Sequence, residues 1–190
     1  MNVEEVLKQY KAGNRNFSGI NLSGVIFKNN NLSQANFSHA ILSGADFTEA
    51  NLKQAIFYQA DLDLGNFSQA ELTQADLTSS SLQSALLYKA SLSKALLLKT
   101  NLSQAILRRA FLRKANLSQA ILTAADLQQV NLIDANLSGA NLTRANLDSA
   151  FLQGANLFQA CLEGANLNNA VLTGAIMPNG RSYEEVRFGE

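Results

Sequence analysis

The chain has 190 residues, the size of one domain, and carries 15 Lys or Arg against 15 Asp or Glu. This balance excludes an overall field that would draw nucleic acid or a cationic partner. The single cysteine, Cys161, excludes an intramolecular disulfide and fits a reducing compartment. Neither a secretory signal nor an apolar run long enough to span a membrane is present. We therefore expect a cytoplasmic protein without a transmembrane segment.

Residues 2–12 predict a short helix. Asn2 can cap its start, Glu5 follows three residues later, and Gly13 suits the position just past its end. The apolar residues recur at helical spacing: Val3, Val6, Leu7 and Tyr10. We interpret the helix as a lid on the structure that follows. The alternative is an amphipathic helix for a membrane or a partner, which its shortness and early acids disfavour.

A five-residue repeat begins directly after this helix. From Phe17 to Leu172 every fifth residue is Leu or Phe, which we call the centre of each pentad. The residue two before the centre is usually Ala, and the residue between them is most often Asn or Asp. On an α-helix these centres would spiral around the axis, and on a straight strand they would alternate between faces. They can all point inward only if the backbone turns once per pentad.

The order of Phe and Leu indicates how many pentads close one coil. Between Phe17 and Phe67 the centres alternate between Phe and Leu, so Phe returns every ten residues. Ten residues are then half a turn, and Phe lines two opposite walls. This predicts a four-sided coil of 20 residues and about eight coils. Asn residues 20 apart, such as Asn116 and Asn136, would stack and bond between coils.

The complete motif Ala-(Asn/Asp)-(Leu/Phe)-x-x resembles the repeat of the pentapeptide repeat family. It occurs 12 times, beginning at Ala35, Ala45, Ala50, Ala60, Ala75, Ala115, Ala125, Ala135, Ala140, Ala145, Ala155 and Ala165. The resemblance implies an all-β fold, a right-handed quadrilateral β-helix. We expect a capping helix at residues 1–14, the β-helix at 15–177 and a capping tail at 178–190. The family shares a fold rather than one function.

The repeat stops after Met177, at a turn signal that contains the only proline. We expect the tail to fold back and cover the last coil with three residues: Tyr183, Val186 and Phe188. Alternatively this end forms a dimer contact, as in some relatives, so we expect a monomer or an end-to-end homodimer. Three outward apolar residues nearby are interpreted as scattered surface residues rather than a second contact patch: Phe151, Phe158 and Val171.

Residues 77–125 depart from the pattern. They contain no acid but seven of the 15 basic residues, and several Asn/Asp positions become apolar. Like charges stacked about 5 Å apart repel by somewhat under 1 kcal/mol in water, so solubility alone would favour alternating signs. We interpret this segment as a partner surface; the alternative is a solvated wall with neutral drift. The basic belt is the following set: Tyr88, Lys89, Lys94, Leu96, Leu98, Ile106, Arg108, Arg109, Phe111, Arg113 and Lys114.

Groups that could perform catalysis are sparse. His39 and Cys161 lie six coils apart, so no thiol–imidazole pair forms. No phosphate-binding loop, metal-ligand cluster or inward pair of acids occurs in the sequence. An interior filled by Leu and Phe leaves no cavity for a substrate. We expect neither enzymatic activity nor a cofactor.

The leading hypothesis is a scaffold whose outer walls bind a protein partner. The resemblance implies one alternative, because some relatives mimic duplex DNA and modulate a type II topoisomerase. That role needs a strongly acidic surface, which this neutral chain with a basic middle lacks. A second alternative is direct binding of nucleic acid or an anionic membrane by the basic belt, and we favour it less than a protein partner.

Overall fold

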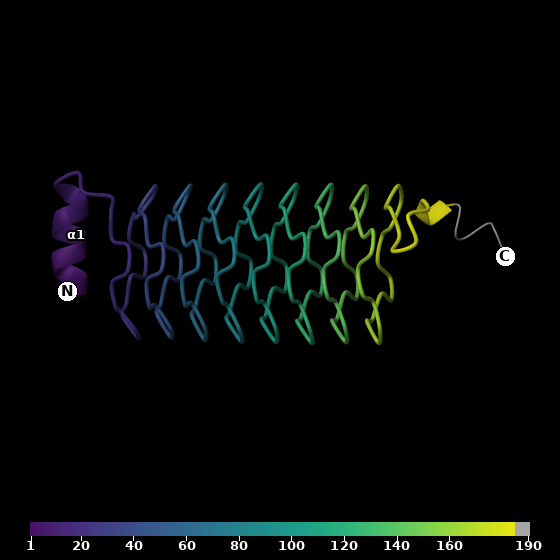
Figure 1. The fold of residues 1–190 in the computed structure, drawn as a ribbon, viewed down its shortest axis with the longest axis horizontal. Coiled ribbons are helices and arrows are strands. Elements are labelled where there is room, and N and C mark those ends of the chain that lie inside the picture. Colours follow the sequence, from purple (N-terminus) through teal and green to yellow (C-terminus); the bar gives the residue numbers. More distant parts are fainter. Residues whose placement is uncertain (185–190) are drawn as a thin grey trace.

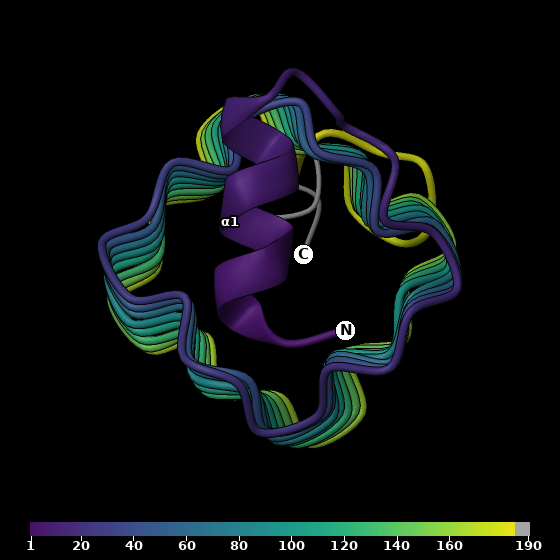
Figure 2. The same ribbon diagram turned by 90° about the vertical axis from the view of Figure 1, so that its left-hand side faces the viewer.

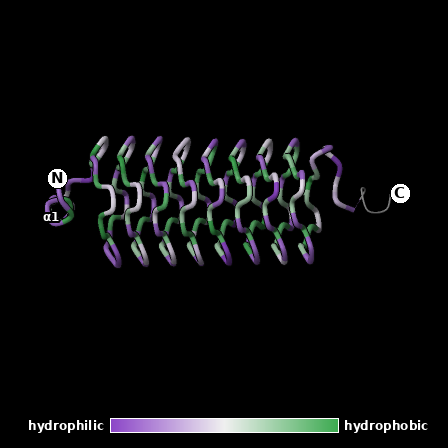
Figure 3. The backbone as a smooth tube through the Cα atoms, turned by 90° about the horizontal axis from the view of Figure 1, so that it is seen from below, coloured by the Kyte–Doolittle hydropathy of each residue, from purple (hydrophilic) through white to green (hydrophobic). Residues whose placement is uncertain are grey.

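The repeat forms a right-handed four-sided β-helix in the computed structural model, which describes residues 1–184 (Figure 1). Its walls are joined by parallel single-residue bridges between residues 20 apart, from Asn16–Asn36 to Asn156–Ile176. About eight coils therefore stack along the long axis, as the alternation of Phe and Leu predicted. Hydrophobic and hydrophilic segments alternate within each coil (Figure 3). The predicted fold class is confirmed.

The backbone turns at the residue two after each centre, which adopts the left-handed region. Gln34 has φ 58°, Lys94 has φ 60°, and the glycine at this position in another coil, Gly139, has φ 65°. An L-amino acid adopts this conformation at a cost of about 1–2 kcal/mol. Other interactions must therefore offset this cost at each corner that is not a glycine. The compensation comes from the backbone hydrogen bonds of the pentad.

In a complete pentad with a coil on either side, every N–H group has an acceptor. Four N–H groups donate to backbone carbonyls: one to the preceding pentad, one to the coil before and two to the coil after. In residues 35–39 these four bonds are Ala35 N to Leu32 O (3.1 Å), Asn36 N to Arg15 O (2.7 Å), Phe37 N to Ile56 O (2.7 Å) and His39 N to Tyr58 O (2.8 Å). The fifth N–H, on Ser38, donates to Oδ1 of the Asn36 side chain at 2.9 Å.

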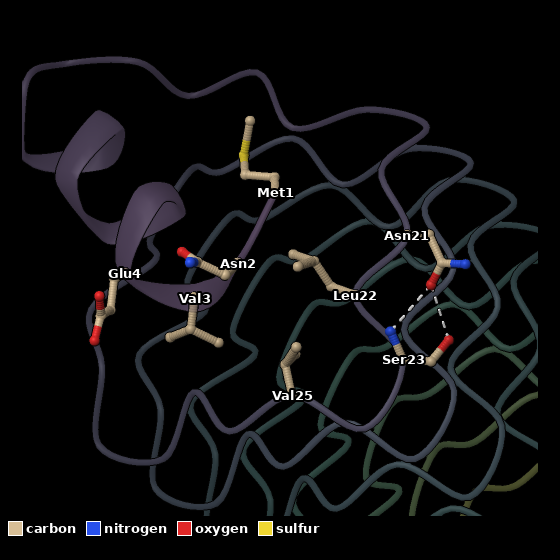
Figure 4. Close-up of a pocket in the computed structure, with 8 residues that line it drawn as sticks. All are labelled: Met1, Asn2, Val3, Glu4, Asn21, Leu22, Ser23 and Val25. Atoms are coloured by element: carbon tan, nitrogen blue, oxygen red, sulfur yellow. Dashed lines mark hydrogen bonds between the residues drawn. The ribbon is translucent and has the colours of Figure 1, made fainter.

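The recurring role of the Asn and Asp side chains is therefore local. Each accepts the N–H two residues later. Figure 4 shows this for Asn21, whose Oδ1 accepts the Ser23 N–H at 3.2 Å. The expected bonds between coils also occur, for example from Asn136 Nδ2 to Asn116 Oδ1 at 3.3 Å, but Asn16 and Asn36, which are also 20 residues apart, make none. The short carboxamide reaches its own turn more readily than the next coil.

The interior is filled by the centres and by the alanines two residues before them. Phe37 stacks on Phe57 with ring centroids 5.4 Å apart, and Phe47 stacks on Phe67 at 5.0 Å on the opposite wall. Across the core, Phe47 meets Phe57 edge-on at 6.0 Å. The prediction that Phe lines two opposite walls is confirmed.

Helix α1, Val3–Lys11, lies across the open end of the first coil (Figure 2). Val6 is fully buried against the core, and the Tyr10 hydroxyl donates to the Ser33 carbonyl at 2.9 Å. Beside the start of α1 an opening of about 530 Å³ remains, with Leu22 facing into it (Figure 4). No helix among residues 1–184 is long and apolar enough to cross a membrane.

Residues 178–184, the part of the tail that the structure describes, contact the last coil. Tyr183 packs against the core, and its N–H donates to the Ala175 carbonyl at 2.9 Å. The Glu184 carboxylate accepts the Gly174 N–H at 2.8 Å, which lowers the pKa of Glu184. Val186 and Phe188, the other two expected covering residues, lie outside the described residues.

The local role of the Asn side chain can be tested at Asn136, whose Oδ1 accepts the Ser138 N–H at 3.1 Å. Asn136→Ala leaves this N–H without its acceptor and should lower the free energy of unfolding by about 0.5–1.5 kcal/mol in urea. Asn136→Asp keeps the acceptor and should lose less. Equal losses in the two variants would show that the local bond contributes nothing.

Candidate partner-binding surface

The 20-residue coil places the basic belt on three neighbouring walls. We define wall A as residues 85–89 and 105–109, wall B as 90–94 and 110–114, and wall C as 95–99. All belt side chains are exposed except Leu98, which is half-buried. Walls A and B hold the belt's six basic residues, three on each, while wall C contributes only two leucines.

The backbone hydrogen bonds between coils align basic residues that are 20 positions apart, as the stacking of like charges requires. The Lys89 N–H donates to the Arg108 carbonyl at 3.1 Å, and the Lys94 N–H donates to the Arg113 carbonyl at 3.0 Å. These bonds set Lys89 beside Arg109 in the next coil. They set Lys94 beside Lys114 in the same way. Neighbouring coils are about 5 Å apart, so each wall concentrates positive charge.

The next coil supplies acids that the segment itself lacks. Arg108 forms an ion pair and a hydrogen bond with Asp126, and Arg113 lies 3.7 Å from Asp134. Residues 77–125 contain no acid, as the sequence analysis noted. Their basic residues nevertheless contact acids of the following coil, which the sequence analysis did not predict. Within residues 1–184, three belt lysines have no ion pair: Lys89, Lys94 and Lys114. The belt is therefore partly neutralised along its C-terminal edge.

A groove of about 450 Å³ follows the corner between walls A and B. Phe111 and Phe151 stand along its one side, 48% and 42% exposed, with the smaller Asn131 between them. Because these residues are two coils apart, the rings are separated by about 10 Å. The opposite side is formed by Lys89, Arg109, Gln129 and Ser149. We call the space over Asn131, between the rings of Phe111 and Phe151, the notch. The groove thus combines this notch with the cations of Lys89 and Arg109.

Phe151 belongs to this groove, although the sequence suggested a scattered surface residue. The signal was its spacing of 40 residues from Phe111, which is two complete coils of one column. Phe158 lies elsewhere, on the continuation of wall C, close to Gly180 of the C-terminal turn. Val171 continues the column beyond Phe151 but does not line the groove.

The reactive groups lie away from the basic belt. His39 sits at a corner with its ring edge-on to Tyr58, 5.6 Å between centroids. Cys161 is exposed and contacts the Thr143 hydroxyl at 3.3 Å, and this hydrogen bond lowers the pKa of the thiol. In the part of the chain that the structure describes, no group of three or more His, Cys, Asp or Glu side chains could hold a metal ion.

A family model described as pentapeptide repeats matches eight copies along the chain. The matches cover residues 31–69, 55–93, 85–123, 120–164 and 152–180. The chain belongs to the pentapeptide repeat family. This result confirms the resemblance drawn from the motif. A search of curated proteins found no match.

Solved structures of other pentapeptide repeat proteins are similar to this one. HetL from the cyanobacterium Nostoc sp. strain PCC 7120, a protein involved in heterocyst differentiation regulation, is 35% identical; the match covers 96% of this chain and 100% of HetL, with a TM-score of 0.34. Rfr23 from the cyanobacterium Cyanothece 51142 is 27% identical over 92% of this chain and 94% of its own, with a TM-score of 0.31. The plasmid-mediated fluoroquinolone resistance protein QnrB1 is 22% identical over 93% and 92%, with a TM-score of 0.77. QnrB1 supports the fold alone.

Charge reversal at Lys94 tests the electrostatics of the belt. Lys94→Glu replaces repulsion from Lys114 with attraction and should raise the free energy of unfolding by about 0.5–1 kcal/mol at low salt. Screening should reduce the gain in about 1 M salt. Lys53 is the control, because it lies 3.8 Å from Glu71, so Lys53→Glu should destabilise the protein. A loss of stability in Lys94→Glu would contradict the unpaired state of Lys94.

Proposed function

We propose that this pentapeptide repeat protein is a non-enzymatic scaffold that binds a protein partner through the basic belt. The groove between walls A and B carries the proposal. It sets the exposed rings of Phe111 and Phe151 beside the cations of Lys89 and Arg109. Buried aromatic and arginine side chains dominate the binding energy of protein interfaces, so this combination is typical of an interface centre.

The extent of the positive charge favours a protein over nucleic acid or a membrane. The basic side chains of the belt span two coils on walls A and B, or about 10 Å along the axis. Acids border the belt on both sides: Glu71 and Asp76 before it, Asp126 and Asp134 after it. An extended row of phosphates would meet these acids, whereas a compact protein segment would not. The same charge pattern disfavours a DNA mimic, which needs an acidic surface.

A location in the cytoplasm is part of this proposal. It rests on the single free thiol of Cys161, which is exposed and suits a reducing compartment. The partner would then be a protein of the same compartment, available to a bait prepared from a native lysate.

Partner capture tests the proposal. A bait with Lys89, Arg108 and Arg109 changed to Glu should lose a protein that the wild-type bait holds, because reversed charge repels a partner that fits the belt. The matched control changes three exposed basic residues outside the belt to Glu: Lys28, Arg144 and Arg181. This control should hold the partner. Circular dichroism should be the same for all baits.

A partner held equally by wild type and the belt variant would remove the belt from the binding site. Loss of the partner from both the belt variant and the control would point to general electrostatic attraction rather than a defined surface.

A further inference from the structure

The basic belt interrupts the pairing of backbone N–H groups that complete pentads show. Between the belt residues Leu98 and Ile106 the Ser103 N–H donates to Asn101 Oδ1, and just after Lys114 the Ser118 N–H donates to Asn116 Oδ1, both at 3.1 Å. Inside the belt, apolar residues occupy the acceptor position at four pentads: Leu86, Leu96, Ile106 and Phe111. The N–H groups two residues after these positions have no acceptor among residues 1–184: those of Tyr88, Leu98, Arg108 and Arg113. The Ser93 N–H, which follows Ser91 on wall B, has none either.

Two of these donors lie on wall A in neighbouring coils. Residues 88 and 108 occupy the same position of the coil, so the N–H groups of Tyr88 and Arg108 are about 5 Å apart. Three basic side chains lie near them: Arg109 on the same wall, Arg108, which is paired with Asp126 of the next coil, and Lys89, whose Nζ is 5.3 Å from the centre of the Tyr88 ring. Tyr88, Arg108 and Arg109 also line a small depression of about 240 Å³ with two glutamines.

The chain itself shows which group suits such a donor. Where the acceptor is an acid, the carboxylate takes the N–H of the turn, as Asp76 does for Thr78 and Asp46 for Thr48, both at 2.9 Å. Hydrogen bonds to a charged acceptor are stronger than neutral ones, and the neighbouring cations favour a negative charge further. A carboxylate brought by a partner would therefore complete the turn that Leu86 and Ile106 leave open.

We propose that the basic belt binds an acidic protein segment whose carboxylates accept the backbone N–H groups of Tyr88 and Arg108. An apolar side chain of the same segment enters the notch between Phe111 and Phe151. This inference rests on the proposed function and specifies the partner's chemistry. A free donor alone does not make the site, because apolar residues outside the belt leave the same N–H without an acceptor. Ile26, Ile41 and Ile56 do so for Lys28, Ser43 and Tyr58. Ile121 does so for Thr123 on the wall opposite wall B, where no belt residue lies.

Substitution at Ile106 tests the donors without changing any charge. Ile106→Asn restores the complete motif, so the fold is retained and the side chain takes the Arg108 N–H. Ile106→Ala removes the same apolar surface but leaves that N–H free. Ile121→Asn is the control, because it makes the same change outside the belt. The probe is a short fluorescent peptide of Asp and Glu around one central Phe, with its Phe→Ser version for comparison.

Wild type should bind the Phe peptide more tightly than the Ser peptide. Ile106→Asn should weaken binding about tenfold, Ile106→Ala at most about threefold, and Ile121→Asn not at all, since one hydrogen bond to a charged group is worth about a factor of ten. In wild type, the amide signals of Tyr88 and Arg108 should shift on peptide addition. Equal losses in the two Ile106 variants, unshifted amides or no binding by wild type would overturn the proposal.

Two further outcomes separate this inference from the proposed function. If the charge-reversed bait loses its partner while Ile106→Asn keeps it, the belt binds a protein but not through these donors. If duplex DNA displaces the peptide and shows the same dependence on Ile106, the acidic occupant is nucleic acid, and the inference of a protein segment is overturned.

Discussion

The structure depends on the acceptors that the N–H groups of a turning pentad find in the backbone and in one side chain. The backbone supplies four acceptors, in the preceding pentad and in the two neighbouring coils. The Asn or Asp side chain supplies the fifth, as Asn36 does for Ser38. These bonds support a left-handed residue at each corner, which an isolated chain disfavours. Because the turn recurs every five residues, four pentads close one coil, and residues 20 apart form columns on the surface.

The interior could be predicted from the sequence because inward positions tolerate few side chains. Every centre from Phe17 to Leu172 is Leu or Phe, and the alternation of Phe with Leu indicated the number of walls. The outer surface could be predicted less fully. The ion pair of Arg108 with Asp126 and the notch between Phe111 and Phe151 join residues 18 and 40 apart, and outward positions carry no volume constraint that would reveal them. The local role of the Asn side chain was missed because the 20-residue spacing of Asn drew attention to contacts between coils.

The division between inward and outward positions also separates folding from function. Inward residues and backbone bonds hold the coil, so outward positions can change with little effect on the fold. At Ile106 and Phe111 the fifth acceptor is absent, yet the parallel bridges to the next coil persist. The basic belt thus carries apolar surface, positive charge and unpaired donors on a rigid frame. A rigid surface of this kind loses little conformational entropy on binding, which favours recognition of a short segment.

Amide hydrogen exchange on the free protein tests this dependence most directly. The N–H groups of Tyr88 and Arg108 should exchange at rates close to those of an unstructured peptide, because no acceptor protects them. The N–H groups of Ser103 and Ser118 occupy the same position of the pentad but donate to the side chains of Asn101 and Asn116. They should therefore exchange more slowly than those of Tyr88 and Arg108. Equal protection of the two pairs would contradict the account, because the side chain at the fifth position would then not decide which donors face a partner.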